Sequence, residues 1–332
     1  MYPIRFTPKG LVDALDATDK FAGACLALTN LVFDQSNPEI MVSRPGAAQI
    51  TAFAGITTPG VVSVQITVGS RTYGMISSAL NAGKDEPFSY NHVTDTFDAV
   101  SGITNANSPT TQATTGAWTP PTMAVIGTRI IVTHPGFPGG ATKFGNFDIS
   151  TVGSPAWAAG DTATNALPST PTAVANFANR AYYACGQSLV YSDVLVPLTV
   201  TNATQALTIG DTNTITALSG LPVQTSSSAV IQALMIFKDF QVWQITGDAA
   251  TSDLLVNFLS LTVGSSSPRS IALSPRGLYF ASIAGPYIIN QLGQLLLVTS
   301  TADLNEPDIV APFQNAVTPS RVAGGYSNGV YR

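Results

Sequence analysis

Hydrophobic and polar residues alternate along much of the chain, which is the pattern of β-strands. In the clearest example, Val62, Val64, Ile66 and Val68 fall on one face and Ser63, Gln65 and Thr67 on the other. Because successive side chains of a strand point to opposite faces, this spacing predicts a half-buried strand over residues 61–68. Similar runs predict further strands at Arg129–Thr133, Ala181–Tyr191, Phe240–Thr246, Gly277–Ile283 and Leu295–Thr299.

Two of these regions carry turn residues between two apolar arms. Gly186 divides the run from Tyr182 to Tyr191, and Gly285-Pro286 divides the run from Leu278 to Ile289. Apolar arms joined by a short segment containing glycine are typical of β-hairpins. We therefore expect a hairpin in each region.

The N-terminal region has a different pattern. Over residues 9–31, Leu11, Ala14, Leu15 and Thr18 follow the i, i+3, i+4, i+7 spacing of a helix, and the spacing recurs from Ala22 to Thr29. Gly23 interrupts it and weakens the helix. We expect a short helical or extended segment here.

Segments with a small or apolar start, a polar or glycine turn and an aromatic or β-branched run recur along the body of the chain. They begin near Ala124, Val174, Ala233 and Ala272, at uneven intervals of about 40 to 60 residues, the size of a blade in a β-propeller. The alternative is a set of unrelated hairpins in a β-sandwich. We predict an all-β, propeller-like assembly of hairpins and small antiparallel sheets.

The change of pattern after residue 46 suggests a domain boundary. We expect an N-terminal docking segment over residues 1–46 and a β-rich, propeller-like body over residues 47–332, with a further division near residue 122 as an alternative. The last residues, Gly329–Arg332, resemble the beginning of a strand. We expect the last blade to be incomplete, with another chain or a continuation of the natural polypeptide completing it.

Charged residues are scarce, and their scarcity narrows the function. They make up 10% of the 332 residues, against about 25% in typical soluble domains. Fourteen Lys and Arg against nineteen Asp and Glu give a net charge of −5, which excludes a nucleic-acid binder with a basic surface. A surface with so few charges indicates contacts with other subunits or a covering of neutral polar residues.

Signals for export, membrane insertion and disulfide formation are weak. The first residues lack an apolar run of leader length, so we expect no secretory leader. No run approaches the length of a membrane-spanning helix. Cys25 and Cys185 have no CxxC spacing, and we expect reduced, buried thiols rather than a disulfide.

No set of residues with catalytic spacing stands out. The two histidines, His92 and His134, lack the neighbours of a zinc site, and no G-x-S-x-G motif occurs. Asp85-Glu86 and the acidic residues within 303–308 are candidates for a hydrolase such as a glycoside hydrolase. The acidic residues within 303–308 are also candidates for weak calcium binding. A solvated acidic loop is the simpler interpretation of residues 303–308. We expect no catalytic residues, no cofactor and no metal.

Aromatic residues of the predicted strands allow two interpretations. They form either a platform for carbohydrate or the packed faces of sheets, and the second is the commoner use of aromatic residues on strands. The residues are Tyr182, Tyr183, Tyr191, Trp243, Tyr279, Phe280 and Tyr287.

Several segments, distributed over most of the chain, together carry a family resemblance in structural rather than chemical motifs. The segments are Phe6–Leu15, Leu28–Leu31, Ser43–Gly46, Ala206–Asp211, Ile215–Pro222, Phe237–Asp248, Pro268–Ala272, Pro312-Phe313 and Pro319–Arg321. They resemble the tail nozzle proteins (tail tubular protein B) of short-tailed bacteriophages.

The resemblance implies a structural protein of the virion tail with propeller-like architecture. It implies a ring, commonly a hexamer, below the portal and adaptor, through which the genome is ejected without sequence-specific binding. It also implies contacts with the tail adaptor and with fibre or spike proteins, and contact with the host envelope. Low positive charge suits such a channel because Lys and Arg would hold the phosphates of passing DNA.

The scarcity of charge in the chain as a whole also suits large subunit interfaces, whose cores are depleted in charged residues. We expect the N-terminal segment to dock on a neighbouring subunit through its apolar residues. Two other functions stay open. One is a receptor-binding adhesin that recognises host-surface glycan, and the other is a propeller-type hydrolase. The predicted interface residues are Leu11, Leu15, Phe21, Leu26, Leu31 and Arg44.

Overall fold

The computed structural model is an all-β protein, as the alternation of the sequence predicts. It describes residues 31–33, 41–43, 61–77, 83–111, 120–151, 153–224, 230–249, 253–298, 322–327 and 330–331. The chain forms two units, Met1–Phe53 and Ala54–Arg332. In the first unit, β1 (Leu31–Phe33) pairs antiparallel with β2 (Met41–Ser43).

Five four-stranded antiparallel sheets make up most of the second unit, and in each the spatial order of the strands follows the sequence. The first sheet comprises β3 (Val61–Val68), β4 (Arg71–Ser77), β5 (Glu86–Asn91) and β6 (Thr96–Asp98), and the second comprises β7 (Thr122–Ile126), β8 (Arg129–Thr133), β9 (Phe144–Asp148) and β10 (Ala156–Gly160). The third comprises β12 (Val174–Phe177), β13 (Arg180–Cys185), β14 (Ser188–Tyr191) and β16 (Ala206–Thr208). The fourth comprises β17 (Ala217–Gln224), β18 (Val230–Phe237), β19 (Val242–Thr246) and β20 (Leu255–Ser260), and the fifth comprises β21 (Ala272–Ser274), β22 (Gly277–Ser282), β23 (Gly285–Asn290) and β24 (Leu295–Leu297).

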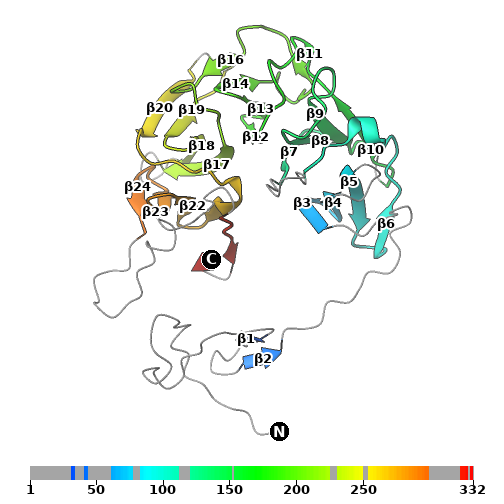
Figure 1. Ribbon diagram of the computed structural model, residues 1–332, viewed down its shortest axis with the longest axis horizontal. Helices are drawn as coiled ribbons and strands as arrows, with labels where there is room; N and C mark the ends of the chain where they lie inside the picture. The colour runs from blue at the N-terminus through cyan, green and yellow to red at the C-terminus, as the bar shows by residue number, and fades with distance from the viewer. Residues whose placement is uncertain are drawn as a thin grey trace. The chain divides into compact units, whose positions relative to one another are not determined.

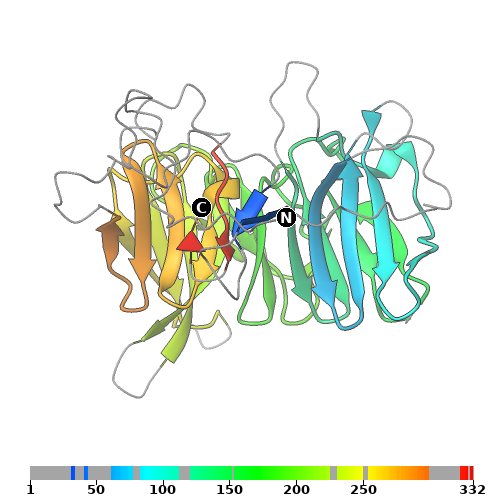
Figure 2. The ribbon, with the colours of Figure 1, turned by 90° about the horizontal axis from the view of Figure 1, so that it is seen from below.

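The five sheets follow one another around an arc (Figure 1). The first strands of successive sheets contact each other along the inner side, from β3 to β7, β12 and β17, and β17 contacts β22 of the fifth sheet. When the arc is viewed from its side, the sheets stand next to one another (Figure 2). Sheets that each run from an inner to an outer strand around an axis are the arrangement of a β-propeller, and the fold is therefore propeller-like.

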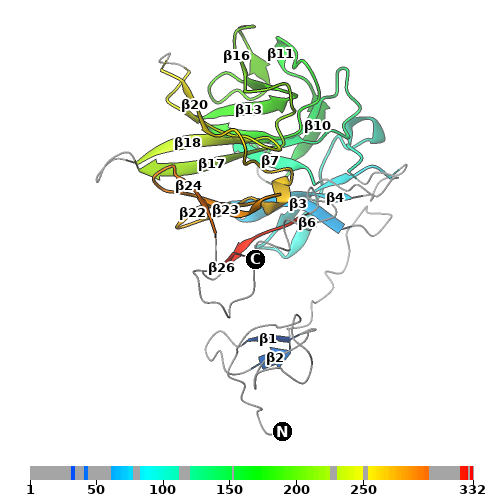
Figure 3. The ribbon, with the colours of Figure 1, turned by 60° about the vertical axis from the view of Figure 1, so that its left-hand side comes forward.

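Short strands outside the five sheets complete the second unit. β11 (Ala163–Thr164) pairs in parallel with β15 (Thr199–Val200). β25 (Tyr326–Ser327) pairs antiparallel with β26 (Val330–Tyr331) and contacts β21. Figure 3 shows β26 beside the fifth sheet. The Tyr279 and Tyr326 rings stack with centroids 6.4 Å apart and help to hold the pair there.

The hydrophobic core is divided into layers between successive sheets. Buried side chains form four clusters, one for each pair of neighbouring sheets. An aromatic pair joins the sheets in three of them: Tyr73 and Phe147 (centroids 5.6 Å apart), Phe144 and Tyr183 (5.3 Å), and Phe237 and Phe280 (5.0 Å). The second, third and fourth sheets thus pack against a layer on each side, and the first and fifth sheets against one layer each.

Three details differ from the sequence prediction. The pairing of β3 with β4 shifts between Val62 and Val64, and this bulge leaves Val62 43% exposed although alternation placed it on the buried face. The fifth-sheet hairpin turns at Ile283-Ala284, and Gly285 already pairs with Ser282. Phe240 precedes β19 and is exposed.

Candidate functional site

A recurrent hairpin turn places an arginine at the start of the second strand in three sheets. The turns are Val68–Arg71, Ile126–Arg129 and Phe177–Arg180. The residue after the apolar one has a positive φ each time, +60° at Gly69, +58° at Gly127 and +49° at Ala178. Positive φ suits the tight turns that match the twist of paired strands. The repeat predicted from the sequence includes the segments around Arg129 and Arg180 but not the turn at Arg71.

Each of these arginines, and two lysines, lies beside a carboxylate in the described part of the chain. The nitrogen–oxygen distances are 2.7 Å for Arg71–Asp98, 2.9 Å for Arg129–Asp148, 2.7 Å for Lys143–Asp161, 3.9 Å for Arg180–Asp248 and 2.9 Å for Lys238–Asp211. A cation held by a carboxylate is less available to an external phosphate. The five paired Lys and Arg side chains therefore attract an external phosphate less strongly than unpaired ones would.

Lys238 joins two segments that carry the resemblance to tail nozzle proteins. Its ammonium group is fully buried and donates to the carbonyl oxygen of Asp211 at 2.6 Å and to Asp211 Oδ1 at 2.9 Å. The hydrogen bond from Lys238 lowers the pKa of Asp211. Asp211 follows β16 and Lys238 follows β18, so the contact links the third and fourth sheets.

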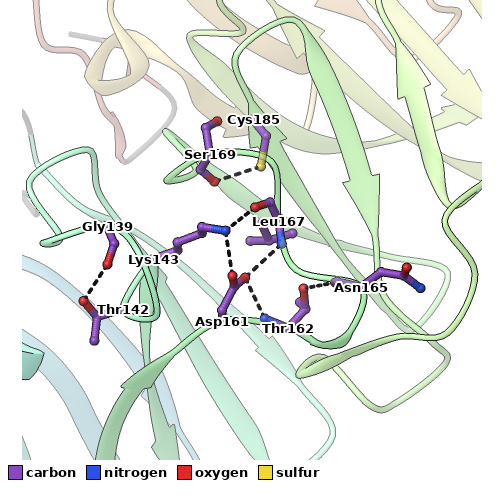
Figure 4. Close-up of polar contacts among 9 residues, drawn as sticks. All are labelled: Gly139, Thr142, Lys143, Asp161, Thr162, Asn165, Leu167, Ser169 and Cys185. Atoms are coloured by element: carbon purple, nitrogen blue, oxygen red, sulfur yellow. Dashed lines mark hydrogen bonds and ion pairs between the residues drawn. The ribbon is translucent and has the colours of Figure 1, made fainter.

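Lys143 and Asp161 hold the loop that leads from the second to the third sheet (Figure 4). Lys143 Nζ donates to Asp161 Oδ2 and to the carbonyl oxygen of Leu167. Asp161 Oδ1 accepts the backbone N–H groups of Thr162 (2.8 Å) and Leu167 (2.9 Å). Because Asp161 accepts two backbone N–H groups of the loop and Lys143 donates to one of its carbonyl groups, this cluster fixes the loop between the two sheets.

Cys185 lies beside the same loop, and its environment makes it unreactive. The thiol is buried, unpaired with another cysteine, and donates to the carbonyl oxygen of Ser169 at 3.5 Å. Burial raises its pKa to about 12. The prediction of a buried reduced thiol is confirmed for Cys185, and Cys25 lies outside the described residues.

In a Cys25→Ser background, we expect native Cys185 to react with a thiol reagent at pH 8 about 1,000-fold more slowly than free cysteine, because the thiolate is the reacting form. Denaturant should restore the rate of free cysteine. Stopped-flow or manual thiol titration measures both rates. Native labelling at nearly the free rate would contradict the buried position.

The outer strands of the fourth and fifth sheets expose large apolar side chains without charged neighbours in the sequence. Residues 254–268 and 277–298 contain no Asp, Glu, Lys or Arg. We call these two strand edges together the apolar outer edge. Its exposed residues are Val256 and Phe258 (60% exposed) on β20 with Leu261 just after it, and Leu296 and Leu297 on β24 with Leu292 before it.

The outer strands of the second and third sheets differ from this edge. β10 exposes Ala156 and Ala158, and β16 exposes Ala206 and Thr208. Small and polar residues on an outer strand fit a surface that faces water. Exposed apolar patches, in contrast, commonly mark interaction sites. The apolar outer edge is therefore our candidate functional site.

Most of the interface residues predicted from the sequence lie outside the described residues. These are Leu11, Leu15, Phe21, Leu26 and Arg44. Leu31 begins β1 and pairs with Ser43. The expected helical or extended segment also falls outside apart from Leu31, and its docking role stays a prediction.

The histidines occupy structural positions. His134 is buried in a turn, and its Nδ1 accepts the backbone N–H of Gly136 at 2.8 Å. His92 is exposed, with Nε2 2.8 Å from the hydroxyl oxygen of Thr72. The described residues contain no group of three or more His, Cys, Asp or Glu that could hold a metal ion.

The acidic candidates for hydrolysis are not arranged as a facing pair. Asp85 is fully buried, and its backbone N–H donates to the carbonyl oxygen of Pro109 at 2.9 Å. Burial raises the pKa of the adjacent Glu86 at the start of β5. Neighbouring residues of an extended chain point in opposite directions, so these two carboxyl groups do not form one site. Residues 303–308 lie outside the described residues.

Most of the aromatic residues considered for a carbohydrate platform pack within the sheets. Tyr182, Tyr183 and Phe280 are fully buried. Tyr182 stacks on Tyr191 with centroids 5.4 Å apart, and Phe280 stacks on Tyr287 at 5.8 Å. In the part of the chain that the structure describes, no helix has the length and apolar character needed to cross a membrane.

Comparison with known proteins gives distant structural likenesses only. No family model and no curated protein matches the sequence. The chain is similar to the extracellular domain of a proposed one component system from B. thetaiotaomicron, at 14% identity and a TM-score of 0.43, over 79% of this chain and 31% of that chain. It is similar to a proposed 6-phosphogluconolactonase from Bacteroides uniformis at 15% identity and a TM-score of 0.43, over 81% of this chain and 77% of that chain.

The chain thus spans about a third of the length of the first of these proteins. At these TM-scores, neither likeness bears on the function of this chain.

Proposed function

We propose that the chain is a structural subunit of the tail of a short-tailed bacteriophage, similar to the tail nozzle proteins. The apolar outer edge carries the proposal because its exposed side chains are large and apolar and come from two sequence segments without charged residues, as is common at subunit contacts. The kind of assembly, a phage tail nozzle, is proposed from the sequence segments that resemble this family. Two of them meet in the Lys238–Asp211 contact.

In this proposal, copies of the chain form a closed ring, of which a hexamer is the family's common form. A ring requires contacts between two different surfaces of each subunit, repeated around an axis. The apolar outer edge supplies one surface, and the N-terminal segment over residues 1–46 supplies another. The tail adaptor and the fibre or spike proteins bind the assembled ring within the virion tail, and the ring contacts the host envelope.

The genome passes through the ring without being held. Phosphate neutralisation by Lys and Arg provides most of the non-specific affinity for DNA. The carboxylates beside Arg71, Arg129 and Lys143, at 2.7 to 2.9 Å, weaken that attraction. A wall of this kind conducts a polyanion and catalyses no reaction.

The decisive experiment measures assembly. We expect the purified chain to form rings with a central hole by negative-stain electron microscopy, with a matching mass by analytical ultracentrifugation. Phe258→Asp combined with Leu296→Asp should reduce the assembled fraction at least about tenfold, because both side chains are exposed on the apolar outer edge and a charge there must be desolvated on contact.

Val93→Asp is the matched control because Val93 is 78% exposed in the first sheet, outside the apolar outer edge. Rings of the control should equal those of the unmodified chain. A monodisperse monomer of the unmodified chain, or equal assembly by the edge variant, would overturn the proposal.

We also expect the assembled chain to bind duplex DNA more weakly than about 10⁻⁴ M at 0.15 M salt, the weak limit of ordinary non-specific binding. Asp148→Asn should release Arg129 and tighten binding about fivefold at 0.05 M salt. Fluorescence anisotropy with a labelled duplex measures both.

Asp95→Asn is the control because it makes the same change in net charge at a carboxylate that accepts a hydrogen bond from Tyr90. Equal tightening by both variants would show that net charge, rather than the release of a paired cation, governs DNA affinity.

A further inference from the structure

A cavity of about 850 Å³ opens between the third and fourth sheets. The β12–β13 turn forms one side, and the beginning of β18, the end of β19 and the beginning of β20 form the other. Its volume falls within the range of small-molecule sites. Neither ring assembly nor the passage of DNA involves this cavity.

The cavity combines hydrogen-bonding groups with a larger apolar surface. Asn179, Gln232 and Thr246 contribute amide and hydroxyl groups, Asp253 contributes a carboxylate, and Ile231 and Leu255 are partly exposed apolar side chains. The residues that line it include no Lys, Arg or His. Such a lining offers both donors and acceptors together with carbon surface.

Both sides of the cavity are held in place. Ala178 and Asn179 occupy the turn with φ values of +49° and +57°, and Asn176 Nδ2 donates to the carbonyl oxygen of Val125 at 2.7 Å. On the other side, Asp253 Oδ1 accepts the backbone N–H of Asp248 at 2.7 Å. A site fixed before binding loses less conformational entropy when a ligand enters.

The charges of the residues around the cavity favour a neutral ligand over an anionic one. Arg180 is buried below the turn, donates to the carbonyl oxygen of Ser192 and lies 3.9 Å from Asp248. It is not among the residues that line the cavity. The lining therefore includes one acidic residue and no basic one, which disfavours phosphates and sugar acids.

We propose that this cavity binds one residue of a neutral sugar. Hydroxyl groups of a sugar both donate and accept, which matches the amides of Asn179 and Gln232 and the carboxylate of Asp253. The C–H faces of the ring contact Ile231 and Leu255. With this site, the proposed tail subunit would also recognise a host-surface glycan. The residues involved differ from the aromatic residues that the sequence offered as a carbohydrate platform.

The test uses the full chain and a panel of free sugars. Saturation-transfer NMR and calorimetry with glucose, galactose, mannose and N-acetylglucosamine should detect at least one ligand with a Kd of about 1 mM or tighter. Glucuronic acid and N-acetylneuraminic acid should not bind. Absence of binding by all four neutral sugars, or binding by the acids alone, would overturn the proposal.

Asn179→Gly and Gln232→Ala should each weaken sugar binding at least about tenfold. Glycine tolerates the positive φ at position 179, so the first variant removes the amide without backbone strain. Asn105→Ala is the matched control because Asn105 is an exposed amide that lies outside both the cavity and the apolar outer edge. Unchanged binding by both cavity variants would overturn the site.

Ring assembly is measured on the same samples. The cavity variants should assemble as the unmodified chain does. Failure of assembly in the unmodified chain, with sugar binding intact, would contradict the proposed wall function and leave the sugar site standing.

Discussion

Replacing Phe237 by alanine is expected to lower the free energy of unfolding by about 3–5 kcal/mol. The side chain is fully buried, and its ring lies 5.0 Å from the ring of Phe280 in the layer between the fourth and fifth sheets. The truncation leaves a cavity that the sheets cannot close without losing other contacts. Denaturant unfolding followed by circular dichroism measures the change.

Phe240→Ala is the control, three positions along the chain. Phe240 is 52% exposed, and we expect a change within about 0.5 kcal/mol, as at most surface positions. Equal effects of the two substitutions would show that the layer between these sheets does not contribute as the structure indicates.

Adding a single methyl group at Gly145 is expected to destabilise the protein by about 1–3 kcal/mol. A Cβ atom on Gly145 would lie 2.0 Å from Cη2 of Trp157 and 3.0 Å from the ring of Phe137. Trp157 is almost entirely buried, so its ring has little room to move. Thermal or denaturant unfolding of Gly145→Ala measures the loss.

Gly160→Ala tests whether any glycine in this sheet has the same effect. Gly160 ends the neighbouring strand β10, and a Cβ atom there would meet no atom within 4 Å. We expect no loss, because alanine restricts the unfolded chain more than glycine does. A loss equal to that of Gly145→Ala would contradict the close approach of Trp157.

Local alternation was sufficient to predict most of the strands. It located β8 and β13 because their apolar and turn residues lie within one short window of sequence. It misplaced Val62 because the bulge in β3 depends on pairing with β4, which alternation within one strand does not reveal. It misplaced the fifth-sheet turn because Gly285-Pro286 is a turn signal that here begins a strand.

The candidate sites depend on contacts between distant residues. The sequence shows that residues 254–268 carry no charge. It does not show that β20 is the outermost strand of its sheet, which depends on strand pairing. The proposed sugar site combines a turn near residue 178 with segments near residues 232, 246 and 253. A repeat search for an apolar residue, a small residue, a polar residue and arginine would have found Val68–Arg71 and its two counterparts.

The layered core has a consequence for how the molecule opens. When each layer is shared by two adjacent sheets, stability resembles a chain of nearest-neighbour couplings. Loosening one layer weakens its two sheets and leaves more distant layers intact, so amide hydrogens should exchange in blocks rather than all at once. The third sheet contacts a layer on each side, and its amides should be among the last to exchange.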